Sequence, residues 1–441
     1  MTNLISRVKT AFVKIGKGFE GLVKILSKTE KYILAGLLII ALASLGLWAK
    51  ELYDSYGNHE KVLAYTEGWL KDSTTNNANL GRLTKAGLTK YDDEGLIVGD
   101  LAEKWEVSSD LLTYTFYLHE NISSSEIIKT IGQNGDLYGS VQAEARDSNQ
   151  IVFTLKQPYN FFLDVTTKPI FTYGPYEIER QSDTVINLVA REDYYQGKPN
   201  INNVQIKIYE TQDALKQAYI SQEIDATCDL TEEQTDSKVQ RVALQRFVSL
   251  FLNTNSSSLN DIEVRKKIIN GESVADLKLK LKLLVSNLPE VDSQLEEVVQ
   301  KLTEQGIELD IVRKDPVEAF KEGVTGRGYD LLIFGIDYSN GQDYYPFWHS
   351  SQIEAPGKNF THVNNVDLDK RLEEARMTSD MTRRQQLILE IKDIIKNQYV
   401  EMPLKEDMLL CQSTSDVENN DIGYITTPQD RYVDIYQWTT K

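Results

Sequence analysis

The chain has 441 residues, enough for two or three domains of ordinary size. Its composition, 41% hydrophobic, 9% aromatic and 26% charged, excludes a fibrous or wholly disordered protein. The formal charge of −18 excludes nucleic acid as an expected partner, because phosphate binding requires a basic surface. Two cysteines exclude a disulfide framework, and four scattered histidines predict neither a metal site nor a cofactor.

The charge is divided unevenly, and the division predicts a membrane anchor. Residues 1–31 carry a net charge of +5, whereas the rest of the chain carries −23. The run YILAGLLIIALASLGLW contains no charged residue, and aromatic side chains bracket it as they do at membrane interfaces. The positive-inside rule therefore predicts a single transmembrane helix at residues 32–49, inserted in the cell membrane with the N-terminus in the cytoplasm. A linker at residues 50–61 then leads to an extracytoplasmic domain.

The N-terminal region leaves two alternatives open. A cleaved signal peptide is one, but the Ala-x-Ala pair Ala41 and Ala43 lies inside the apolar run rather than after it. Residues 1–31 show apolar side chains at helical spacing, typical of an amphipathic helix in the headgroup region or of a helix that binds a partner protein. These apolar residues are Ile5, Val8, Phe12, Ile15, Phe19, Leu22 and Leu26.

The extracytoplasmic part begins with alternating elements of a mixed α/β domain. VLAYTEGWL, residues 62–70, predicts a strand that runs into a loop, and residues 80–88 predict a short helix that ends at a glycine. LTYTFYL, residues 112–118, alternates with period two, as a half-buried strand does.

Farther along, a strand at residues 277–285, a helix at 291–306 and a strand at 307–312 predict a β-α-β unit and thus a parallel sheet. A second long helix is predicted at residues 382–398, with the buried stripe Leu387, Ile391, Ile394 and Ile395. The tail is rich in turns and aromatic residues.

A series of short motifs resembles the family 5 extracytoplasmic solute-binding proteins, the peptide- or nickel-binding components of ABC importers. In chain order these motifs are LTKAGLTKYD (83–92), GLIVGDLAEKWEV (95–107), DLLTYTFYL (110–118), PYNFFLDVTTKPIF (158–171), GPYEI (174–178), YYQGKPNINNVQIKIYE (194–210), QEIDA (222–226), FLNTN (251–255), EVRKKI (263–268), YDLLIFG (329–335), DYYPFWHSSQI (343–353) and VDLDKRLEEARMTSDMTRRQQL (366–387). The chain departs from the family after Leu118, where a usual motif is missing, and between Arg265 and Leu279, where the second lobe is trimmed.

The resemblance implies a two-lobed α/β fold of the periplasmic-binding-protein type II. Lobe I would span residues 62–250, lobe II residues 251–405, and residues 406–441 would return to lobe I. A cleft between hinged lobes would close over a short peptide or another small solute and deliver it to an ABC permease.

The resemblance also implies where ligand contacts lie. A carboxylate near the end of a lobe II strand would anchor a peptide's ammonium, and both Asp337 and Asp343 are candidates. Tyr338, Trp348 and His349 in the same segment, and Glu67, Gly68 and Trp69 at the end of the first strand, are further candidates. Each residue also has a purely structural interpretation, as a turn cap or a packed core side chain.

No catalytic motif is present: the sequence contains no G-x-S-x-G, H-E-x-x-H, C-x-x-C or Walker loop. We therefore expect a binding protein rather than an enzyme. Cys228 and Cys411 are either paired or free. The main alternative function is a ligand-free scaffold or receptor-like protein that kept the fold, which the trimmed second lobe favours.

Overall fold

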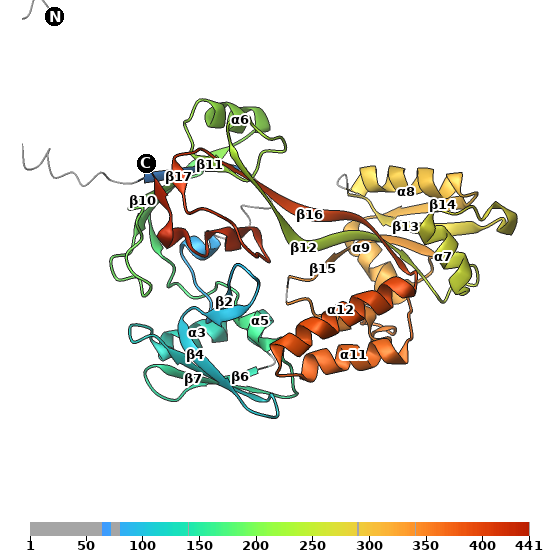
Figure 1. The fold of residues 1–441 in the computed structure, drawn as a ribbon, viewed down its shortest axis with the longest axis horizontal. Helices are drawn as coiled ribbons and strands as arrows, with labels where there is room; N and C mark the ends of the chain where they lie inside the picture. Colours follow the sequence, from blue (N-terminus) through green and yellow to red (C-terminus); the bar gives the residue numbers. More distant parts are fainter. Residues whose placement is uncertain (1–63, 72–79, 140, 289–290, 340, 441) are drawn as a thin grey trace, which may run out of the picture. The chain divides into compact units, whose positions relative to one another are not determined.

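The structure is a computed structural model that describes residues 64–71, 80–139, 141–288, 291–339 and 341–440. Its largest element is a mixed sheet of ten strands that runs through both lobes. The order across this sheet is β14 (Glu308–Lys314), β13 (Lys280–Ser286), β15 (Leu331–Asp337), β12 (Lys238–Leu252), β16 (Glu401–Ser413), β11 (Ala226–Thr227), β1 (Ala64–Leu70), β10 (Asn203–Tyr209), β9 (Val185–Ala190) and β8 (Tyr176–Gln181) (Figure 1).

Two long antiparallel strands, β12 and β16, connect the lobes (Figure 1). They pair from Lys238 opposite Ser413 to Phe251 opposite Glu401, with a register shift between Ala243 and Phe247. At one end β16 also pairs with β11, and at the other β12 pairs with β15. We call the β11–β8 side of the sheet and the elements packed on it lobe I, and the β13–β15 side lobe II. The two-lobed α/β architecture is therefore held together by a shared sheet.

Lobe I contains a second, four-stranded antiparallel sheet and a small hairpin. The second sheet has the order β4 (Ala102–Val107), β5 (Thr113–Leu118), β7 (Gln150–Leu155) and β6 (Val141–Ala145), and the hairpin joins β2 (Thr89–Tyr91) to β3 (Ile97–Gly99). The helices of this lobe are α3 (Ser124–Gln133), α4 (Gly135–Tyr138), α5 (Phe162–Thr166) and α6 (Gln212–Ile220). The predicted alternation of β5 is confirmed, since Tyr114, Phe116 and Leu118 are buried and their neighbours are not.

The helix predicted at residues 80–88 is wrong in extent. Only a single 3₁₀ turn, η1 (Gly81–Leu83), forms there. Leu80 and Gly81 both have positive φ, so the chain enters the turn from a left-handed conformation that no continuing α-helix tolerates. Gly87 then passes so close to the carbonyl oxygens of Thr166 and Thr167 that a Cβ would lie 2.8 and 2.7 Å from them. The glycine therefore allows a close backbone contact and does not end a helix.

Lobe II contains the predicted β-α-β unit. β13 and β14 are parallel and joined by α8 (Asp292–Glu304), whose Leu295, Val298 and Leu302 are buried. Gly306 follows the helix with φ +91°, and a Cβ there would lie 2.5 Å from the Cβ of Ala275. Gly306 thus ends α8, and the absence of a side chain lets the turn that holds Ala275 pack against it.

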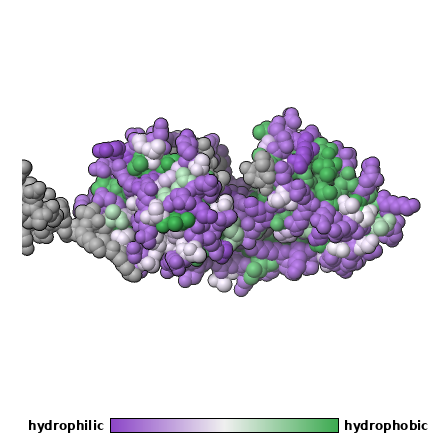
Figure 2. All heavy atoms as spheres, turned by 90° about the horizontal axis from the view of Figure 1, so that it is seen from above, coloured by the Kyte–Doolittle hydropathy of each residue, from purple (hydrophilic) through white to green (hydrophobic). Residues whose placement is uncertain are grey.

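The remaining elements of lobe II cover both faces of its sheet. They are α7 (Ile262–Asn270), η2 (Ala275–Leu277), α9 (Pro316–Lys321), a π turn η4 (Glu322–Gly326), α10 (Tyr345–Trp348), η5 (Ser350–Gln352), α11 (Val366–Met377) and α12 (Met381–Asn397). In α12 the predicted residues Leu387, Ile391 and Ile395 are buried, but Ile394 is only partly buried. Figure 2 shows mostly polar side chains on the upper face, with an apolar area on the right-hand half, which holds lobe II.

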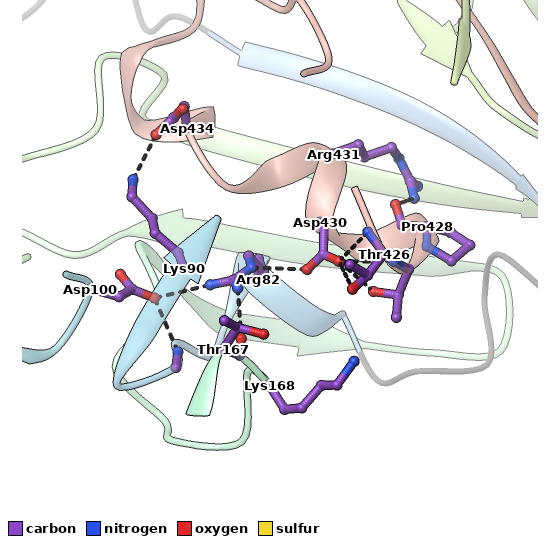
Figure 3. A network of polar contacts seen from close by, with 12 residues as sticks. Arg82, Lys90, Asp100, Thr167, Lys168, Thr426, Pro428, Asp430, Arg431 and Asp434 are labelled. Atoms are coloured by element: carbon purple, nitrogen blue, oxygen red, sulfur yellow. Dashed lines mark hydrogen bonds and ion pairs between the residues drawn. The ribbon is translucent and has the colours of Figure 1, made fainter. Parts of the chain in front are cut away.

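The C-terminal segment consists of β17 (Val417–Glu418), η6 (Pro428–Tyr432), η7 (Ile435–Gln437) and β18 (Thr439–Thr440). It packs into lobe I through buried ion pairs: Arg82 contacts both Asp100 and Asp430, at 2.9 and 3.1 Å (Figure 3). Lys90 reaches Asp434 at 2.9 Å from the same side.

Cys228 and Cys411 form a disulfide, which answers the question that the sequence left open. Cys228 follows β11 and Cys411 lies on the neighbouring β16. The bond therefore joins one of the two connecting strands to lobe I.

The predicted amphipathic helix, transmembrane helix and linker of residues 1–61 lie outside the described residues. Within the part of the chain that the structure describes, no helix has both the length and the apolar character needed to cross a membrane.

Candidate functional site

The segment that follows β15 holds five of the predicted ligand contacts. Asp337 ends the strand with an exposed carboxylate, 51% of its side chain being accessible. This carboxylate accepts from the amide of Ser339 at 2.8 Å and faces Arg246 at 3.4 Å. Among the two candidate aspartates, Asp337 is the one whose carboxylate reaches solvent.

Asp343 lies in the same segment but is engaged by the protein. Its carboxylate is only 9% exposed and accepts from Arg376 Nη2 at 2.6 Å and from Arg376 Nε at 3.1 and 3.2 Å. The Tyr159 hydroxyl donates to it at 3.2 Å, and the amide of Tyr345 does so at 3.2 Å. Asp343 thus caps the start of α10 and neutralises an arginine of α11.

Tyr338 and Trp348 form a buried pair in this segment. Trp348 Nε1 donates to the Tyr338 hydroxyl at 2.8 Å, and Tyr338 stacks on Tyr344 with ring centroids 4.3 Å apart. Burial, together with the charge of Glu401, raises the pKa of Tyr338 well above its usual value. Both rings serve as packed core side chains here, and Tyr338 also faces a cavity considered below.

His349 is buried beside two acidic residues. Its Nδ1 lies 2.8 Å from Ser351 Oγ, and its Nε2 lies 3.3 Å from Glu373 and 3.8 Å from Asp369. The imidazole also stacks on Tyr345 at 4.1 Å. These contacts fix the segment against α11. Among the described residues, no group of three or more His, Cys, Asp or Glu side chains is arranged to hold a metal ion.

The remaining candidates, Glu67, Gly68 and Trp69, lie on β1 in lobe I. Glu67 is fully buried and accepts from Arg431 Nη2 at 2.8 Å, from the Tyr65 hydroxyl at 2.7 Å and from Trp69 Nε1 at 3.1 Å. Burial alone would raise the pKa of Glu67, but Arg431 and the hydroxyl donors hold it below its usual value.

Gly68 has a packing role in the same strand. A Cβ at this position would lie 2.4 Å from Ile224 Cδ1 and 2.6 Å from Leu215 Cδ1. Only glycine lets α6 and the chain after it pack so closely on β1. Among the described residues, no hydrogen bond, ion pair or ring contact is found between Glu67, Gly68 or Trp69 and the 337–349 segment.

Between the lobes the structure places a buried ion pair that the sequence analysis missed. Asp164 of α5 has no exposed side-chain surface and accepts from Arg384 Nη1 of α12 at 2.7 Å. The Tyr91 hydroxyl donates to the same carboxylate at 2.7 Å. Arg384 occurs three residues before Leu387 and so lies on the buried stripe of α12. A charged residue on an apolar helix face needs a partner, so this position could have predicted a buried ion pair.

A lysine makes a second contact between the lobes. Lys168 Nζ donates to the backbone carbonyl of Ser339 at 3.1 Å (Lys168 is shown in Figure 3). Burial lowers the pKa of Lys168, an effect opposed by the nearby charges of Asp430, Asp337 and Asp164. We call Asp164, Arg384, Lys168 and Ser339 the interlobe seam.

The seam is tightly packed where the 337–349 segment meets α5. Gly341 has φ +76°, and a Cβ there would lie 2.2 Å from the carboxylate carbon of Asp164. Lobe I thus contacts the backbone of the segment in which the resemblance places the ligand.

Comparisons with known proteins agree with this architecture. The family described as "Bacterial extracellular solute-binding proteins, family 5 Middle" matches residues 127–270. HbpA2 from Haemophilus parasuis superposes with a TM-score of 0.74 over 86% of this chain and 100% of its own, at 14% identity. The chain is thus similar to family 5 solute-binding proteins in this middle segment, and it has the fold of HbpA2. Two further structures have a similar fold. A nickel ABC transporter protein from Bacillus halodurans has a TM-score of 0.68 at 17% identity, over 84% of this chain and 98% of its own. The oligopeptide-binding protein AppA from Bacillus subtilis, in complex with a nonapeptide, has a TM-score of 0.58 at 16% identity, over 86% of this chain and 99% of its own.

A curated relative in sequence comes from Brucella ovis and is provisionally named an ABC transporter peptide-binding protein. It is 26% identical over 235 residues, which cover 42% of this chain and 44% of the relative. A Brucella abortus protein matches equally well. The chain thus spans less than half the length of the curated relatives that it matches.

Proposed function

We propose that this chain is the extracytoplasmic binding component of an ABC importer and captures a short peptide between its lobes without chemical change. The observation that carries the proposal is the pair of strands β12 and β16, which join two α/β lobes in one sheet. Such a connection lets lobes close on a ligand by small backbone changes. The AppA structure cited above contains a peptide, which supports this ligand class.

Asp337 is the proposed anchor for the ammonium of the peptide. It is the candidate carboxylate that is exposed, it ends a strand of lobe II, and the next residues contact lobe I through Lys168. The other candidates, Glu67, Gly68, Trp69, Tyr338, Asp343, Trp348 and His349, are proposed to shape the site through the contacts described above.

We further propose that residues 32–49 anchor the chain in the lipid bilayer, with residues 1–31 in the cytoplasm and the ABC permease as partner of the lobes. The disulfide between Cys228 and Cys411 supports an extracytoplasmic position of the lobes, because disulfides persist in oxidising compartments. Mass spectrometry of the native protein tests the anchor: a mature N-terminus after residue 43 would contradict it.

Binding is tested on the purified full chain by native mass spectrometry and by thermal shift with a pool of tripeptides. We expect bound peptide and a raised melting temperature. Asp337→Asn should weaken binding about 10–100-fold, since a charge-assisted hydrogen bond contributes about 1.5–3 kcal/mol. Asp276→Asn, which removes an exposed carboxylate from another turn of lobe II, should bind as the unchanged chain does.

A ligand-free scaffold is the second candidate, and the interlobe seam favours it. The buried Asp164–Arg384 pair and the close approach of Gly341 fill part of the space between the lobes with the protein's own atoms. If neither the unchanged chain nor a chain with the seam opened by Asp164→Asn binds any peptide, the transport proposal fails and the scaffold stands.

A further inference from the structure

 Lobe II contains a cavity with a volume of about 520 Å³, and no residue of the interlobe seam lines it. It lies between α12, the end of α7 and the strands β12 and β16, and this volume is within the range of small-molecule sites, roughly 300–1,000 Å³. The lining residues are Phe247, Ile269, Asn270, Tyr338, Tyr344, Lys392, Ile395, Lys396, Tyr399, Glu401 and Pro403.

The wall of the cavity holds one carboxyl group that has no cation beside it. Glu401 is the first residue of β16 and is partly accessible. Ser249 Oγ donates to its Oε1 at 2.8 Å, and no ion pair within 4.0 Å is recorded for this carboxyl among the described residues. Burial raises the pKa of Glu401, an effect that Ser249 only partly opposes. A carboxylate in this position is stabilised by any cation that enters the cavity.

The rest of the lining is aromatic and aliphatic, apart from two lysines. Tyr338 and Tyr344 are buried and stacked on each other, and Phe247 and Tyr399 are partly buried. Aromatic faces favour both an apolar body and a cation. Lys392 and Lys396 are exposed one turn apart on α12 and line the same cavity. The cavity therefore offers a single negative group, apolar walls and positive groups on its exposed side.

We propose that this cavity is a second binding site, separate from the space between the lobes, for a small zwitterion with an apolar side chain, such as a free aromatic amino acid. The ammonium of the ligand binds Glu401, its side chain packs against the tyrosines and Phe247, and its carboxylate faces Lys392 and Lys396. Tyr338 is also a candidate residue of the interlobe site, but all the lining residues belong to lobe II or to its end of the connecting strands. The proposal therefore does not depend on peptide capture between the lobes.

Isothermal titration of the full chain with three probes of one shape tests the charge pattern. The probes are L-phenylalanine, phenethylamine, which lacks the carboxylate, and 3-phenylpropanoate, which lacks the ammonium. We expect L-phenylalanine to bind most tightly. 3-Phenylpropanoate should bind about 10–100-fold more weakly, because it loses the charge-assisted bond to Glu401. Phenethylamine should lose only about 2–5-fold, because both lysines are solvent-exposed.

Variants assign the binding to this cavity. Glu401→Gln keeps the size of the side chain, and it should weaken L-phenylalanine binding about 10–100-fold while circular dichroism shows an unchanged fold. Asp407→Asn removes another carboxylate from β16 that does not line the cavity, so binding should be unchanged. Asp337→Asn should also leave it unchanged, which separates this site from the interlobe proposal.

Three results would overturn the proposal. One is the absence of binding by all three probes. Another is equal binding of L-phenylalanine and 3-phenylpropanoate, and the third is full affinity in a folded Glu401→Gln chain. Loss of L-phenylalanine binding in Asp337→Asn but not in Glu401→Gln would move the ligand to the space between the lobes.

Discussion

Two glutamates on the same ten-stranded sheet have opposite surroundings. Glu67 on β1 in lobe I is enclosed by Arg431 and by hydroxyl and indole donors, and its pKa lies below the usual value. Glu401 on β16 in lobe II has one recorded donor, Ser249, and burial raises its pKa. Glu67 is almost fully buried, whereas Glu401 is partly accessible. The number of partners separates them further: Glu67 is a structural ion, whereas Glu401 is left with capacity to bind.

The largest effect is expected from Glu67→Gln. The change leaves the Arg431 guanidinium buried without its counter-charge, and breaking such a pair costs about 3–5 kcal/mol of unfolding free energy. Urea denaturation at pH 7 measures the loss. The double variant Glu67→Gln/Arg431→Met should recover part of it, and equal stability of the single and double variants would contradict the role given to the pair.

Gly341→Ala should cost less. The alanine would have to keep the left-handed backbone conformation of Gly341, and its Cβ would collide with the Asp164 carboxylate. We expect a loss of about 1–3 kcal/mol in the free energy of unfolding. Gly335→Ala is the matched control, because its Cβ would meet nothing closer than the Phe247 carbonyl oxygen at 3.9 Å. A similar melting temperature for both variants would show that the seam is not tightly packed.

Glu401→Gln should stabilise the protein at neutral pH, by about 1 kcal/mol. A raised pKa means that the folded state favours the protonated carboxyl, so its contribution is complete below the unfolded pKa and is lost as the pH rises through the folded one. The gain from Gln should therefore be present at pH 7 and vanish near pH 4. Glu67 has the reverse sign, since its lowered pKa makes its contribution disappear as the pH falls. Unfolding curves at both pH values check the two directions.

The smallest effect on stability is expected from Asp337→Asn. Its pairing with Arg246 at 3.4 Å is solvent-exposed, and such pairs contribute about 0–1 kcal/mol. Chemical denaturation should give nearly the same midpoint with and without the substitution. A loss above about 2 kcal/mol would mean that Asp337 is a structural residue like Asp343 and not a free anchor.

The local spacing of apolar residues predicted strands and helices in both lobes. The alternation of residues 112–118 identified β5, and the spacing of Leu295, Val298 and Leu302 identified α8 between two parallel strands. These elements follow from which side chains must leave water, and that information is local in the sequence. The helix predicted around Gly81 is only a short turn, because the backbone conformation there depends on contacts with distant segments.

Pairings between distant residues could not be read in the same way. Asp164 and Arg384 are 220 residues apart, and nothing near either one identifies the other as its partner. The same holds for Cys228 and Cys411, 183 residues apart. Glu401 lies in a strand that alternates irregularly, so its position beside a cavity became visible only with α12 in place.

The pairing of Glu67 with Arg431 has a consequence for biosynthesis. The two residues are 364 positions apart, so a long stretch of chain must follow the first strand of lobe I out of the ribosome before Arg431 does. Until then the buried carboxylate of Glu67 has no counter-charge. Contacts of such long sequence separation form slowly, so the core of lobe I should be completed late in folding.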